Sequence, residues 1–172
     1  RGSGGYGKEF VAKGRQANGY GMRMQDDLND VVDWLGKQGV VDPKRACIMG
    51  WSYGGYAAAR GAQRDAARWR CAVAGAGVYD QPMMKSYDLG EFGKFGANFQ
   101  ATGDDLIATS PARNTRQAWS PILIVAGLRD ARIPIEQSRT LVSRLKSSGK
   151  EQGKDFDYIE QPKGTHNLPY ED

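Results

Sequence analysis

The sequence has few of the residues that hold metal ions and no long apolar run. Its 172 residues include one histidine and two cysteines, and Cys47 and Cys71 do not have C-x-x-C spacing. These residues cannot assemble the usual ligand set of a zinc site. No apolar stretch approaches the roughly 20 residues of a transmembrane helix, and no secretory signal is visible. We therefore expect neither a metal nor a membrane partner.

Two cysteines are also too few for a disulfide framework. Cys47 and Cys71 fall in two strand-like runs that a parallel sheet would place side by side. A cysteine thiol nevertheless behaves as a small apolar group and is often found in protein cores. We expect two buried free thiols rather than a disulfide.

The composition is that of one ordinary soluble globular domain, with 40% hydrophobic and 26% charged residues. The net charge of +4 and a pI of about 9.1 raise the question of nucleic-acid binding, and Arg60, Arg64 and Arg68 recur on one helical stripe. That spacing on an alanine-rich helix is typical of a solvated face. Since no recognised nucleic-acid motif accompanies the stripe, we do not expect a nucleic-acid partner.

Strand-like and helical patterns alternate along the chain, which favours an α/β fold with a parallel sheet and right-handed crossovers. Strands are predicted near 45–49, 71–76, 121–126 and 156–160. The apolar run at 121–127 is typical of a strand buried on both faces. One amphipathic helix should place its apolar side on the sheet with Met24, Leu28, Val31, Val32 and Leu35. Another should begin at Pro134 and end at Gly149, with Ile135, Leu141, Val142 and Leu145 buried.

The most informative motif is a serine between glycines at 50–56, Gly-Trp-Ser-Tyr-Gly-Gly-Tyr. It follows a strand-like run and precedes a helical one, as in the nucleophile elbow of hydrolases. Glycines are needed on both sides because the turn forces an unusual backbone angle and the helix packs tightly on the next strand. Ser52 is the predicted nucleophile, and the backbone N–H of Tyr53 is the predicted oxyanion donor. The alternative is a glycine-rich turn with an idle serine.

A serine nucleophile needs a base, and His166 is the only histidine of the chain. It lies in a Gly- and Pro-bounded loop after the last strand-like run, where hydrolases with this elbow carry their histidine. The acid should follow a strand between the two, and Asp130 follows the run 121–127. Asp80, after the preceding strand, is the rival. A lone histidine can also be a surface or structural residue.

The chain resembles the prolyl oligopeptidase family of serine peptidases over nearly its whole length. The resemblance rests on the segment 1–7, the acidic helix after 25–27, the approach at 41–45, the elbow, Asp-Ala-Arg-Ile-Pro at 130–134 and Gly-Thr-His at 164–166. The Trp-Ser-Tyr of the elbow resembles the elbow sequences of the dipeptidyl-peptidase and acylaminoacyl-peptidase branches more than that of prolyl oligopeptidase itself. The family implies an α/β-hydrolase fold with helices on both faces of a mostly parallel sheet. It also implies peptidase activity on short peptides through Ser52, His166 and Asp130.

The same resemblance implies substrate-binding residues. Family members can bind a substrate carbonyl with the arginine two residues after the catalytic aspartate, which would be Arg132. The alternative for Arg132 is a surface ion pair with Glu136. We also place Trp51 and Tyr87 at the substrate. The stretch 80–119 is irregular, and its large side chains form a lid or pocket wall or else ordinary core contacts: Tyr79, Met83, Met84, Tyr87, Phe92, Phe95 and Phe99.

Family domains begin several strands earlier than residue 1, and a β-propeller that filters substrates by size usually precedes them. The resemblance therefore implies that residues 1–172 are one partial catalytic domain, with the rest of that domain and a propeller as partners. The family's side-chain oxyanion donor, a tyrosine, comes from the earlier region, so we expect weak or no activity from residues 1–172 alone. The sequence does not determine the oligomeric state. It also does not determine whether the protein is cytoplasmic or is exported to the periplasm or secreted.

Three alternatives to a peptidase remain at this point. A carboxylesterase of the same fold would use the same triad, and a non-catalytic interaction domain would keep the fold alone. The run Gly-Ser-Gly-Gly-Tyr-Gly at 2–7 also matches the dinucleotide pattern G-x-G-x-x-G. No strand precedes that run in this chain, so we expect no dinucleotide cofactor.

Overall fold

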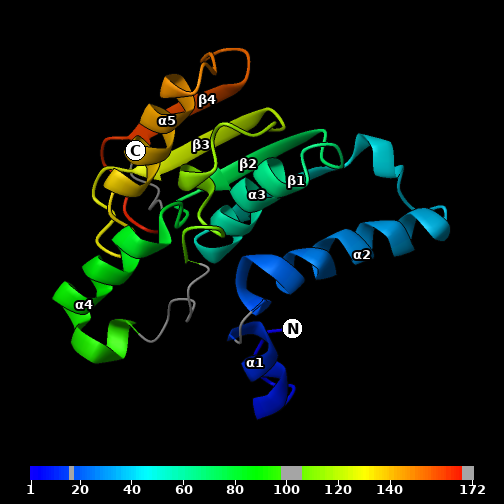
Figure 1. Ribbon diagram of the computed structural model, residues 1–172, viewed down its shortest axis with the longest axis horizontal. Coiled ribbons are helices and arrows are strands. Elements are labelled where there is room, and N and C mark those ends of the chain that lie inside the picture. Colours follow the sequence, from blue (N-terminus) through cyan, green and yellow to red (C-terminus); the bar gives the residue numbers. More distant parts are fainter. Residues whose placement is uncertain (16–17, 98–105, 168–172) are drawn as a thin grey trace.

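Four parallel strands form the sheet at the centre of the computed structural model (Figure 1), which describes residues 1–15, 18–97 and 106–167. The strands are β1 (Cys47–Trp51), β2 (Cys71–Gly75), β3 (Ile122–Gly127) and β4 (Phe156–Gln161), and they lie in the order β1-β2-β3-β4. Each strand is parallel to its neighbour. The predicted parallel sheet is confirmed, with strand ends within two residues of those expected.

Helices connect the strands and precede the first one. Helices α1 (Lys8–Arg15) and α2 (Met24–Lys37) come before β1, and the connections then contain α3 (Tyr53–Arg64), α4 (Gln81–Ala97) and α5 (Glu136–Ser147). Short helical turns lie at Gly19–Arg23, Pro43–Arg45 and Pro111–Arg113. Among the described residues, no helix has both the length and the apolar character that crossing a membrane requires.

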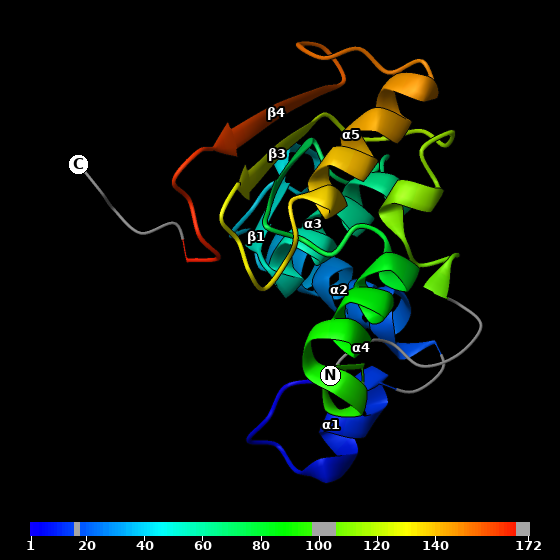
Figure 2. The same cartoon turned by 90° about the vertical axis from the view of Figure 1, so that its left-hand side faces the viewer.

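The main core lies between the sheet and helices α3 and α5, which pack on the same face (Figure 2). Alanines on α3 allow a close approach to the strands, while α5 contributes larger apolar side chains, as predicted. The buried cluster includes Ala58, Ala59, Ala62, Leu141, Val142 and Leu145 against Ile48, Ala74, Ile124 and Phe156. Burial alternates along β3, where Leu123 and Val125 are only half-buried. The expectation that this strand is buried on both faces is therefore wrong.

The helix predicted near 24–35 forms as α2, but its apolar side does not pack on the sheet. Leu28, Val31 and Trp34 are 37%, 55% and 60% exposed. Helices α3 and α5 already cover the sheet face that would receive them. Helix α2 instead contacts α3, where Val32 packs against the edge of the core and the buried Gln25 amide donates to the carbonyl of Ala57.

Two arginines of α3 and a third in the turn after it make this contact, so the prediction of a solvated face is also wrong. Each guanidinium bonds to the segment that ends in α2: Arg60 to the carbonyl of Gly21, Arg64 to Asp26 and Arg68 to Asp33. Arg60 is buried, and the other two are partly covered. Arg68 lies beyond the end of α3 at Arg64, so the three arginines do not share one helix face. Asp26 and Asp33, far away in the sequence, pair with Arg64 and Arg68.

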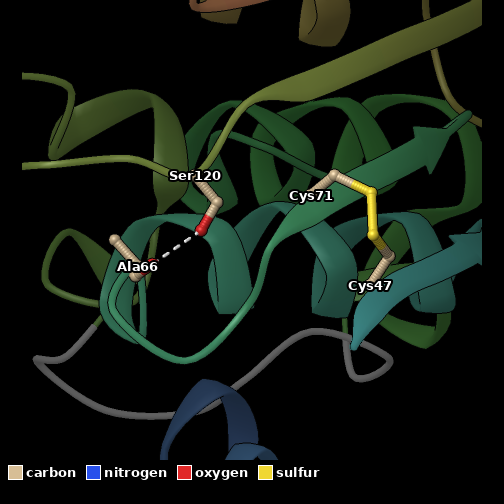
Figure 3. Close-up of a disulfide and its surroundings, with 4 residues drawn as sticks. All are labelled: Cys47, Ala66, Cys71 and Ser120. Atoms are coloured by element: carbon tan, nitrogen blue, oxygen red, sulfur yellow. Dashed lines mark hydrogen bonds between the residues drawn. A yellow bond between two sulfur atoms is a disulfide. The ribbon is translucent and has the colours of Figure 1, made fainter. Parts of the chain in front are cut away.

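Cys47 and Cys71 form a disulfide between β1 and β2 (Figure 3), contrary to the expected buried free thiols. The two residues are direct partners in the strand register, and their Cα atoms are 4.7 Å apart, within the range that a disulfide bridges. Cys47 is exposed and Cys71 half-buried, so neither is a core thiol. The sequence predicted adjacent strands, but the exact pairing depends on a register that it does not reveal.

Candidate active site

Ser52, Asp130 and His166 meet at the carboxyl edge of the sheet. Ser52 directly follows β1, Asp130 lies three residues beyond β3, and His166 lies five residues beyond β4. Because all four strands are parallel, these loops emerge at the same edge. His166 Nδ1 is 2.8 Å from Asp130 Oδ2, and His166 Nε2 is 3.0 Å from Ser52 Oγ. The three predicted residues therefore form one hydrogen-bonded chain.

The backbone at Ser52 has the strained geometry that a strand-to-helix elbow requires. Its φ is 58° and its ψ is −119°, in a region that costs a residue with a side chain on the order of 1–3 kcal/mol. The turn is held by two backbone bonds: Ser52 N donates to Gly75 O at 2.9 Å, and Tyr56 N donates to Ser52 O at 3.1 Å. The hydroxyl consequently stands at the N-terminus of α3.

The glycines around Ser52 are not equally necessary. A Cβ on Gly50 would lie 2.3 Å from the carbonyl carbon of Gly54, and a Cβ on Gly55 would lie 2.1 Å from Gly75 O. A Cβ on Gly54, the last glycine of the Gly-x-Ser-x-Gly pattern, would meet nothing within 4 Å. The close approach of α3 to β2 thus depends on Gly55, which lies outside the motif.

Gly55→Ala and Gly54→Ala form a matched pair of substitutions on adjacent residues of one helix. We expect Gly55→Ala to lower the free energy of unfolding by about 1–3 kcal/mol, because the methyl group collides with a strand carbonyl. Gly54→Ala should leave stability unchanged or raise it by up to about 1 kcal/mol, as alanine replaces glycine in a helix. Urea unfolding of both variants measures the difference, and equal losses would contradict the proposed packing.

The carboxylate of Asp130 is fixed on both of its oxygens. Oδ1 accepts from the backbone N–H groups of Arg132 and Ile133, each at 2.8 Å, and Oδ2 faces His166. Only 1% of the side chain is exposed. An ionised carboxylate can only accept hydrogen bonds, so the proton of a neutral His166 lies on Nδ1. Nε2 then presents its lone pair to the Ser52 hydroxyl.

Asp80, the rival acid, belongs to a different network. It is fully buried, and its Oδ2 accepts from Arg113 Nε at 2.6 Å, while Arg144 approaches to 3.7 Å. Its backbone N–H donates to the side chain of Gln137. This aspartate therefore connects the start of α4 to the turn at 111–113 and to α5.

Tyr53 is the first residue of α3, and the amides of a first helical turn have no partner within the helix. Its ring closes a cluster with Tyr20 and Tyr56, at centroid distances of 5.3 and 5.8 Å. Burial raises the pKa of the Tyr56 hydroxyl well above its usual value, and that hydroxyl donates to Thr109 O at 3.0 Å. Tyr56 is therefore neutral at physiological pH and anchors the first turn of α3.

Arg132 pairs with Asp88 on α4 and not with Glu136, the partner named in the alternative to substrate binding. Its Nη1 lies 2.7 Å from Asp88 Oδ1, and its guanidinium lies 5.6 Å from the centre of the Phe92 ring. Asp88 is fully buried, whereas 37% of the Arg132 side chain stays exposed. Sequence reasoning missed Asp88, because no motif surrounds it and its partner lies 44 residues away.

The two other predicted substrate-binding residues bond to loops of the site. Tyr87 on α4 donates its hydroxyl to Ala131 O at 2.7 Å, and Trp51 donates its indole N–H to His166 O at 2.6 Å. The stretch expected to be irregular forms helix α4 over Gln81–Ala97. Tyr79, just before it, and Met84 are fully buried core residues, while Phe92 is half-exposed near Tyr87. Phe99 lies outside the described residues, as does the side chain of Phe95. Helix α4 therefore borders the site through Tyr87, Asp88 and Phe92.

The chain has well-matched relatives. It is 33% identical over 175 residues to the uncharacterized peptidase YuxL of Bacillus subtilis, covering 98% of this chain and 25% of that protein. It is 32% identical to dipeptidyl aminopeptidase BIII of Pseudoxanthomonas mexicana, covering 86% of this chain and 22% of the relative. The chain thus spans about a quarter of the length of these proteins.

Solved structures share the fold. The acylaminoacyl peptidase of Pyrococcus horikoshii aligns with a TM-score of 0.78 and 25% identity, over 96% of this chain and 27% of that one. A puromycin-hydrolyzing peptidase of Mycobacterium tuberculosis aligns with a TM-score of 0.81 and 23% identity, over 97% and 25%. The fold is that of the α/β-hydrolase peptidases. The model of the prolyl oligopeptidase family matches residues 1–172, and the chain belongs to that family.

Proposed function

We propose that this chain carries the catalytic centre of a serine peptidase, with Ser52 as nucleophile, His166 as general base and Asp130 as the acid that orients the histidine. The observation that carries the proposal is the hydrogen-bonded chain from Asp130 through His166 to Ser52. Nε2 accepts the serine proton as Oγ attacks the scissile carbonyl, and the imidazolium then returns it to the leaving amine. The fixed carboxylate stabilises the imidazolium in between.

The oxyanion would be stabilised at the N-terminus of α3. We propose the backbone N–H of Tyr53 as one donor, because it directly follows the nucleophile and heads a 12-residue helix. Partial positive charge at such a terminus favours a developing negative charge. The chain matches only part of its relatives, so we further propose that it acts within a larger protein. The rest of the catalytic domain and a propeller would be its partners there.

Short peptides are the proposed substrates. Relatives of the chain are named dipeptidyl aminopeptidase and acylaminoacyl peptidase, and we propose that Arg132 binds a peptide carbonyl. One of its nitrogens holds Asp88, while the guanidinium carries further donors and stays partly exposed. A carboxylesterase with the same triad is the second candidate, and it would need no such contact.

An aminoacyl anilide and an ester of the same acyl group separate the two candidates. A peptidase should hydrolyse both substrates, whereas an esterase should neglect the amide, whose leaving group is more demanding. The measurement uses the full-length protein that contains this chain. Turnover of the ester alone would replace the peptidase proposal with the esterase one.

Arg132→Ala should raise KM for peptide substrates and leave kcat nearly unchanged. Losing a hydrogen bond to a charged group costs about 1.5–3 kcal/mol, or roughly 10- to 150-fold. A small ester that lacks the peptide carbonyl proposed to bind Arg132 should show a far smaller rise in KM. Arg139→Ala is the matched control, because Arg139 forms an ion pair with Glu160 on the outer surface. Equal losses on both substrates would remove Arg132 from the substrate site.

A further inference from the structure

The indole of Trp51 bridges two loops that follow the outer strands of the sheet. Trp51 ends β1, and its Nε1 donates at 2.6 Å to the backbone carbonyl of His166, 115 residues away. β1 and β4 lie at opposite ends of the four-strand order, roughly 14 Å apart at a spacing of about 4.8 Å per strand. The indole lies over the end of β2, and the loop that follows β4 returns over the end of β3 to meet it.

Gly75 at the end of β2 leaves room for this side chain. Gly75 is the register partner of Trp51, and a Cβ there would lie 1.9 Å from Trp51 Cε3 and 2.1 Å from Cζ3. The ring thus lies against the backbone of β2, in space that any other residue would fill. The same glycine accepts the hydrogen bond from Ser52 N, so the nucleophile and the indole share one support.

The histidine loop has a second anchor on β3. The carbonyl of Gly164 accepts from Arg129 N at 2.9 Å, and the loop backbone packs on Gly127, where a Cβ would lie 2.4 Å from Gly164 O. Within the described part of this loop, which ends at residue 167, the bond from Trp51 holds the backbone of His166 itself. Asp130 fixes only the imidazole.

We propose that Trp51 is a positioning residue for the general base. This inference rests on the proposed function of Ser52 and His166. Trp51 is covalently next to the nucleophile and hydrogen-bonded to the base, so one rigid unit sets the distance between Oγ and Nε2. Proton transfer needs that distance within about 2.6–3.2 Å, and a shift of about 1 Å can cost on the order of 100-fold in rate. This positioning role differs from the substrate contact expected of Trp51 from the sequence.

Two variants of the full-length protein test the proposal. Trp51→Phe keeps an aromatic ring but removes the donor, and replacement by 3-benzothienyl-alanine substitutes sulfur for the indole N–H with nearly unchanged shape. We expect both to lower kcat and the rate of fluorophosphonate labelling by roughly 10- to 100-fold, with KM within about twofold. A rise in KM with unchanged kcat would show substrate binding instead and overturn the proposal.

Trp119→Phe is the matched control, because its indole donates to a backbone carbonyl, Asn114 O at 3.2 Å, outside the site. It should keep full activity. If Trp51→Phe is slow and the sulfur isostere is not, packing accounts for the effect and the hydrogen-bond proposal fails. Full rates in both variants also overturn it. Neither result bears on the assignment of Ser52 as nucleophile. That assignment is wrong only if the unsubstituted protein is not labelled at Ser52.

Discussion

Ser52→Ala should abolish fluorophosphonate labelling of the full-length protein and lower kcat by at least about 10⁴-fold. The substitution removes the attacking oxygen and leaves the rest of the site in place. The backbone bonds at the elbow involve the N–H and C=O of residue 52 rather than its side chain, so the fold should persist. Circular dichroism checks that the variant is folded, and activity-based labelling checks the nucleophile.

Ser147→Ala is the matched control for that experiment. Ser147 lies on the exposed side of α5, where its hydroxyl donates to Ser143 O. Labelling should be unchanged in this variant. If Ser52→Ala is still labelled, another residue is the nucleophile and the proposed triad is wrong.

Asp130→Asn should lower kcat by about 10⁴-fold without unfolding the protein. The amide oxygen can still accept from the N–H groups of Arg132 and Ile133. The NH₂ group would then face His166 Nδ1 and donate to it, which moves the imidazole proton to Nε2. Nε2 could no longer accept the proton of Ser52, and a loss of this size is typical of the wrong tautomer.

Asp80→Asn provides the contrast, because Asp80 is the other acid in the sequence that follows a strand. It should keep kcat within a few-fold but lower the free energy of unfolding by about 1.5–3 kcal/mol, since Arg113 loses a charged hydrogen bond at a buried site. Kinetics and urea unfolding of the two variants separate the roles. The reverse pattern, an inactive Asp80→Asn and an active Asp130→Asn, would exchange the two assignments.

The sequence predicted the parts of this molecule that depend on local patterns. Strand, elbow and helix follow one another around Ser52, and Asp130 and His166 each follow a strand. In a parallel sheet this is enough to bring the three residues to one edge. This prediction needs no knowledge of side-chain packing, because the positions of the three residues after their strands already bring them together.

The features that sequence reasoning missed depend on pairings between distant segments. The apolar residues of α2 have a correct helical period, but the period does not say which surface the helix contacts. The prediction that Arg60, Arg64 and Arg68 face solvent is wrong because their partners, a carbonyl and two aspartates, lie in a distant segment of the chain. Asp88 has no local signature, and the role of Gly55 depends on the position of Gly75 O.

The disulfide between Cys47 and Cys71 makes a covalent ring out of β1, the elbow, α3 and the start of β2, with a sequence separation of 24. Ser52 lies inside that ring. A single backbone cut between the two cysteines opens the ring but releases no fragment, because the sulfur bridge still joins both ends. A protein nicked in α3 should therefore migrate as one species until a thiol is added, with its nucleophile still attached to the sheet.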